Sequence, residues 1–121
     1  MALYFTATVA VRVSESSTSD RHFQDTNDVT TDTTALTETT GLNRKVVADG
    51  ASDEALSFSG VASGSYFYFK SSQDVSIKLN GSSTALAVAK GKALYAPITV
   101  TSCTVTNGSG NDANIDYSVS G

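Results

Sequence analysis

The sequence has few of the residues on which many enzymes and secreted proteins depend. Its 121 residues include one cysteine, one histidine, one proline and no tryptophan. A single cysteine excludes an intrachain disulfide, so we expect synthesis in a reducing compartment, the cytoplasm. No apolar run approaches the length of a membrane span, and the N-terminal stretch lacks the basic residues of a signal peptide. We therefore expect no membrane partner.

Positive charge is also scarce. The net charge is −4, and residues 15–54 hold nine of the twelve acidic and three of the eight basic residues, a balance of −6. Phosphate binding requires clustered lysine and arginine, and the chain has no such cluster. We expect no nucleic-acid partner.

Hydroxyl side chains and alternating patterns dominate what is present. The chain contains 18 serines and 16 threonines, and residues 3–14 alternate between apolar and mainly polar side chains. Period two is typical of strands. Short alternating segments recur after residue 55, with turn residues between them; at Thr101 and Ser102 the alternation changes parity, which favours a bulge or a change of sheet. The predicted core consists of Leu3, Phe5, Val9, Val11, Phe58, Phe67, Phe69, Val75, Ile77, Leu79, Val100, Ile115, Tyr117 and Val119.

These patterns predict an all-β chain, an antiparallel β-sandwich or jelly roll of about seven or eight short strands. We expect one domain over residues 1–121, with a long polar arm or loop at 15–48 and a compact, strand-rich part at 55–121. The arm has few apolar side chains and cannot fold alone, so we expect neighbouring subunits to order it.

Candidate reactive residues are isolated. His22 and Cys103 could act as base and nucleophile in a hydrolase, but no orienting third group accompanies them. Three sets of loop acids could bind calcium, although none has a recognised spacing. These sets are Asp25, Asp28 and Asp32; Asp49, Asp53 and Glu54; and Asp112 in the loop at 107–112. We expect no enzyme activity, no metal and no cofactor.

Candidate partner contacts are apolar residues of the arm and tyrosines that share one face of a strand. Tyr66 and Tyr68 alternate with Phe67 and Phe69, so both tyrosines should lie on the outer face of a sheet. The candidate contacts are Phe23, Val29, Leu36, Leu42, Tyr66 and Tyr68.

The C-terminal two-thirds resembles a known group of proteins. The segments SGSYFYFKSSQDVSIKLNGSSTALAV and APITVTSCTVTNGSGNDANIDYSVSG resemble small all-β virion structural proteins of tailed bacteriophages. The resemblance covers roughly residues 55–121 and consists of strands and turns rather than a catalytic signature.

The resemblance implies a non-enzymatic virion protein, made in the host cytoplasm. Its role would be capsid decoration (cement), or that of a head or tail accessory protein. It also implies a homo-oligomer, a trimer or higher, that binds other virion proteins such as the major capsid protein. Two alternatives remain open: a carbohydrate-binding or host-recognition module of a phage tail that uses Tyr66 and Tyr68, and the hydrolase that would use His22 and Cys103.

Overall fold

The computed structural model describes residues 3–13 and 26–121, and these residues form ten strands without a helix. They divide into two compact units, Met1–Leu36 and Thr37–Gly121. We call them the hairpin and the body. The strands are β1 Leu3–Val13, β2 Thr26–Leu36, β3 Asn43–Val47, β4 Glu54–Ala55, β5 Tyr66–Ser71, β6 Val75–Leu79, β7 Leu86–Val88, β8 Ala93–Ala96, β9 Cys103–Thr106 and β10 Ala113–Ser120.

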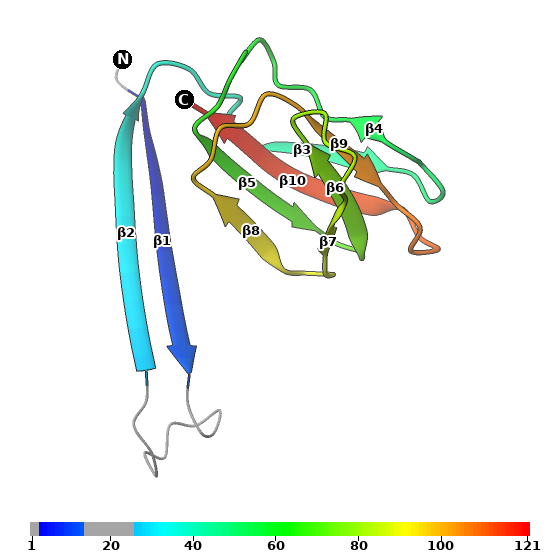
Figure 1. Ribbon diagram of the computed structural model, residues 1–121, viewed down its shortest axis with the longest axis horizontal. Helices are drawn as coiled ribbons and strands as arrows, with labels where there is room; N and C mark the ends of the chain where they lie inside the picture. Colours follow the sequence, from blue (N-terminus) through cyan, green and yellow to red (C-terminus); the bar gives the residue numbers. More distant parts are fainter. Residues whose placement is uncertain (1–2, 14–25) are drawn as a thin grey trace. The chain divides into compact units, whose positions relative to one another are not determined.

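The hairpin is a two-stranded antiparallel sheet of β1 and β2 (Figure 1). All eleven residues of each strand are paired, from Leu3 opposite Leu36 to Val13 opposite Thr26. β-branched residues favour this extended backbone. The hydroxyl groups of Thr6 and Thr33 lie 3.3 Å apart, which adds a cross-strand hydrogen bond.

The body contains two four-stranded antiparallel sheets with the strand orders β3-β10-β5-β8 and β4-β9-β6-β7 (Figure 1). Both sheets contribute inward-facing side chains to one core, an arrangement consistent with a β-sandwich. The buried hydrophobic residues are Val47, Leu56, Val61, Phe67, Phe69, Val75, Ile77, Val88, Val100, Cys103, Val105, Ala113, Ile115, Tyr117 and Val119.

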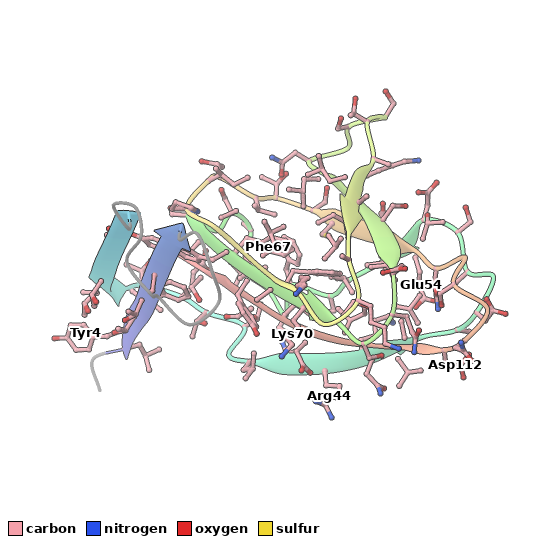
Figure 2. The ribbon with its side chains drawn as sticks, turned by 90° about the horizontal axis from the view of Figure 1, so that it is seen from below. Tyr4, Arg44, Glu54, Phe67, Lys70 and Asp112 are labelled. Carbon is pink, nitrogen blue, oxygen red and sulfur yellow. The ribbon has the colours of Figure 1, made fainter. Side chains whose placement is uncertain are left out.

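The centre of the core follows the predicted alternation. Phe67 and Phe69 on β5 are fully buried, and their ring centroids lie 6.1 Å apart (Figure 2 shows Phe67). Tyr117 on β10 is also buried, and its hydroxyl donates to the Ser57 carbonyl oxygen at 2.7 Å. This bond satisfies the one polar atom of the side chain, so the ring can lie in the core.

The predicted core was wrong for the first strand. Leu3 and Val9 are about two-fifths exposed, and no described side chain of the hairpin is buried. The side chain of Val11 lies outside the described residues. Alternation shows only that one face of a strand is apolar, whereas burial requires a second layer of structure over that face.

The polar segment at 15–48 contains regular structure that its composition did not indicate. Residues 26–36 form β2 and residues 43–47 form β3, so the expected long loop is at least partly replaced by strands. Pairing with the long β1 supplies the backbone hydrogen bonds that an isolated threonine-rich segment lacks. The count of seven or eight strands is not confirmed, since the described residues form ten.

The start of the body is fastened to its last residues. The backbone N–H groups of Thr37 and Glu38 donate to the Gly121 carbonyl oxygen at 2.8 and 2.9 Å. The Thr40 N–H donates to the Val119 carbonyl oxygen at 2.9 Å, and the Thr40 hydroxyl oxygen accepts from the Val119 N–H at 3.0 Å. Residues 37–40 therefore belong structurally to the body.

Replacing Gly64 by alanine should destabilise the body by about 1–3 kcal/mol, the usual cost of overpacking. Gly64 forms an antiparallel bridge with Val100, and a Cβ atom there would collide with the side chain of Val119. Thermal unfolding measures the loss. Gly108→Ala is the matched control, because its new Cβ meets nothing within 4 Å; equal melting temperatures for the two variants would contradict the packing argument.

Candidate binding surface

The outer face of the sheet β3-β10-β5-β8 gathers aromatic and charged side chains from all four strands. On β5 the buried Phe67 and Phe69 alternate with Tyr66, Tyr68 and Lys70, which therefore face outward. The strand register then places Tyr68 between Ser118 and Tyr95, and Lys70 next to Asp116. We call this surface the outer face.

Three tyrosines form its aromatic part. Tyr68 lies directly opposite Tyr95 on β8. Tyr66, one diagonal step away, stacks on Tyr95 with ring centroids 6.5 Å apart and an interplanar angle of 4°. All three are half-buried. Nearly parallel rings on adjacent strands form a favourable cross-strand pair, and we call the three tyrosines the aromatic platform.

A charged row crosses the same sheet beside the tyrosines. Arg44 on β3 donates from Nε to Asp116 Oδ1 at 2.7 Å and from Nη2 to Asp116 Oδ2 at 3.1 Å. The hydrogen bond from Arg44 lowers the pKa of Asp116, and Lys70 on the other side lowers it further. The same bond raises the pKa of Arg44. Two cations face one carboxylate, so this part of the outer face is net positive.

Apolar side chains flank the charged row at the edge of the sheet. Val46 on β3 is 57% exposed, and Leu42, just before the strand, is 72% exposed. Leu42, Arg44 and Val46 have the same parity, so the edge alternates aliphatic, cationic and aliphatic groups (Figure 2 shows Arg44). We call these three residues the β3 edge.

The structure brings some of the predicted contacts together and separates others. Tyr66 and Tyr68 share the outer face, as predicted, and Leu42 lies at its edge. Leu36 is half-buried at the end of β2, in the hairpin. Val29 is in β2 with its side chain outside the described residues, and Phe23 lies outside them entirely.

Sequence reasoning missed Arg44, and it did not select Tyr95 or Val46 as contacts. The position of Tyr95 could have been predicted, because in the alternating segment ALYA an inward-facing Leu94 places its neighbour Tyr95 on the outer face. Arg44 had none: its partner Asp116 is 72 residues away, and only the register of β3 on β10 pairs them.

The candidate calcium acids have structural partners in the body. Asp49 Oδ1 accepts from the Gly110 N–H, and Asp112 Oδ1 accepts from the Asp49 N–H, both at 3.0 Å. Asp53 lies 3.1 Å from the Lys78 ammonium, and Glu54 lies 3.6 Å from that of Lys45. Asp25 and the side chains of Asp28 and Asp32 lie outside the described residues, and among the side chains that are described no group of three or more potential ligands could hold a metal ion.

The candidate catalytic pair is not assembled in the described part of the chain. His22 lies outside it, and Cys103 is 1% exposed in the core. Burial raises the pKa of Cys103 to about 12, so the thiol stays protonated at neutral pH.

Cys103 should therefore react slowly with a thiol reagent in the native protein and rapidly in denaturant. Burial raises the pKa of Cys103 from 9.0 to about 12, so above pH 9 the thiol ionises in the unfolded chain before it does so in the folded one. The contribution of Cys103 to the free energy of unfolding is therefore complete below pH 9 and is lost as the pH rises towards 12. Labelling with a chromogenic disulfide at pH 8 measures the first effect. Equal native and denatured rates would show that the thiol is accessible.

No helix in the described ranges is long and apolar enough to cross a membrane. No protein-family model, curated protein or solved structure matches this chain.

Proposed function

We propose that this chain is a non-enzymatic structural protein of a bacteriophage particle, most simply a capsid decoration or head–tail accessory protein. The observation that carries the proposal is the division of the chain into a body with its own core and a paired hairpin with no buried side chain among its described residues. A two-stranded sheet is marginally stable in water, so such a hairpin is suited to binding a neighbour.

We infer further that the body is a jelly roll. Its strands pair in nested order: β3 with β10, β4 with β9, β5 with β8 and β6 with β7. When these nested strand pairs fold over into two sheets, β10 also pairs with β5 and β9 also pairs with β6. Jelly rolls occur in viral capsid and lectin domains, which supports the proposal by analogy of fold alone.

The proposed partners are further copies of the chain and other virion proteins, such as the major capsid protein. Apolar side chains and one free, buried cysteine fill the core of the body, so it would keep its fold both in the reducing host cytoplasm and on a particle.

Mass spectrometry of phage particles purified from cells that express the chain tests the proposal. We expect the chain in the particle fraction at a fixed ratio to the major capsid protein, through successive density gradients. Its presence in the cell lysate together with its absence from intact particles would contradict the proposal.

A second candidate function is glycan binding by a phage tail module, favoured by the stacked Tyr66 and Tyr95 beside Tyr68. Aromatic faces offer apolar contact area with hydroxyl groups at the rim, which suits the alternating faces of a sugar ring. A glycan array tests this function. Binding that Tyr68→Ala abolishes would support it, whereas binding unaffected by that substitution would exclude this platform.

A further inference from the structure

We propose that the hairpin of one copy pairs with the free edge of β3 in a second copy and so extends the sheet β3-β10-β5-β8. The inference rests on the proposed function, because it identifies the partner of the hairpin within the particle. The contact is head-to-tail, since every copy carries both a hairpin and an edge. Repetition of such a contact closes into a ring when the rotation permits, and otherwise gives a filament.

β3 is the longest edge strand of the body. It has five residues, and within the described residues it pairs with β10 alone. The other outer strands are shorter: β4 has two residues, β7 has three and β8 has four. Pro97, which lacks a backbone donor, directly follows β8 and limits pairing there. An unprotected edge is a template for an added strand.

The side chains at this edge also favour a covered surface. Leu42 and Val46 are more than half exposed, whereas the other exposed large aliphatic residues of the body, Leu86 and Ile98, are less than half exposed. In the hairpin, Leu3 and Val9 are about two-fifths exposed on one face of β1. Pairing the hairpin with the β3 edge would bring aliphatic groups of the two copies together and remove them from water.

Charge complementarity selects a second copy as the occupant. Residues 1–36 contain two arginines and five acids, a balance of −3, and β2 itself has Asp28 and Asp32 but no basic residue. The outer face has Arg44 and Lys70 against Asp116. The two hydrogen bonds to Asp116 use two of the five N–H groups of the Arg44 guanidinium. The Arg44 side chain is 67% exposed. A carboxylate from β2 could therefore bind there as well.

Cross-linking between singly substituted chains tests the contact. One full-length variant carries Thr30→Cys, at an exposed position of β2 between the two acids, and the other carries Val46→Cys on β3. A flexible bismaleimide, which tolerates uncertainty in register, should give a covalent dimer in the mixture and not with either variant alone. Wild-type protein controls for the buried Cys103, and Ala87→Cys on the other sheet replaces Val46→Cys as the positional control. A mixture that gives no dimer, or gives as much dimer with Ala87→Cys, would overturn the proposal.

A charge placed at the edge gives an independent measurement. Val46→Asp should weaken self-association by roughly tenfold or more in sedimentation velocity, because the new carboxylate would repel the acidic β2 strand and compete with it for Arg44. Leu86→Asp, at a residue 47% exposed on β7, is the matched control and should change self-association little. Equal effects of the two substitutions, or a monomeric wild-type protein at every concentration, would contradict the proposal.

The two proposals fail separately. A chain that is present on particles but does not self-associate through β3 would retain the proposed function and lose this inference. A chain that forms the β3 contact in pure solution but is absent from particles would do the opposite.

Discussion

Replacing Phe67 by alanine should lower the free energy of unfolding of the body by about 3–5 kcal/mol. The Phe67 ring, labelled in Figure 2, is fully buried, and its centroid lies 6.1 Å from that of Phe69. Removing it leaves a cavity lined by side chains of both sheets, which a close-packed core fills only in part. The loss is a large fraction of the about 5–15 kcal/mol that stabilises a typical domain.

Denaturant unfolding followed by circular dichroism measures this loss. Leu42→Ala is the control, because a side chain 72% exposed contributes little to the folded state and should change stability by less than about 0.5 kcal/mol. Ile77→Ala, on the opposite sheet, should cost about 2–5 kcal/mol. If Phe67→Ala were as mild as Leu42→Ala, the two sheets could not share the core described here.

The sequence predicted the body better than the hairpin. Phe67, Phe69, Ile77, Ile115 and Val119 were assigned to the core from alternation alone, and all five are fully buried. The change of parity at Thr101 and Ser102 falls between β8 in one sheet and β9 in the other. Local period-two patterns suffice for such features because a strand in a sandwich always has one covered face.

The hairpin was not predicted because the composition of residues 26–36 does not show that they pair with β1. Threonine-rich residues 26–36 were interpreted as an arm, although threonine favours strands whenever a partner is present. Leu3 and Val9 were assigned to the core by the same alternation that succeeded for β5. The difference lies in tertiary structure: β5 has a second sheet against it, and no described residue of the hairpin is buried.

Only the part of the candidate surface that lies on one strand could be predicted from the sequence. Tyr66 and Tyr68 share a strand, so their common face follows from parity. The pairing of Arg44 with Asp116, and of Tyr68 with Tyr95, depends on the register between strands that are distant in sequence. Register is set by the whole core rather than by neighbouring residues, so one sequence alone did not supply it.

Deleting residues 1–36 should leave the body folded and abolish both self-association and incorporation into particles. Among the described residues, the fifteen buried hydrophobic ones all lie between Val47 and Val119, so the deletion removes none of them. We expect the free energy of unfolding of the body to change by less than about 1 kcal/mol, because separate cooperative units contribute separately to stability. We expect particle-bound protein to fall by roughly tenfold or more, because the proposed pairing strand is lost.

The end point of the deletion decides how the result can be interpreted. A longer deletion, through residue 41, also removes the donors of Thr37, Glu38 and Thr40 that bond to Gly121 and Val119. At about 1 kcal/mol for each lost hydrogen bond, it should destabilise the body by a few kcal/mol. Comparing the two deletions by thermal unfolding and by particle sedimentation therefore separates loss of binding from loss of folding. If the chain without residues 1–36 is folded and still enters particles normally, the hairpin is not the contact. The tyrosines of the outer face then become the leading candidate, because they are the largest aromatic group on the body that a partner could cover.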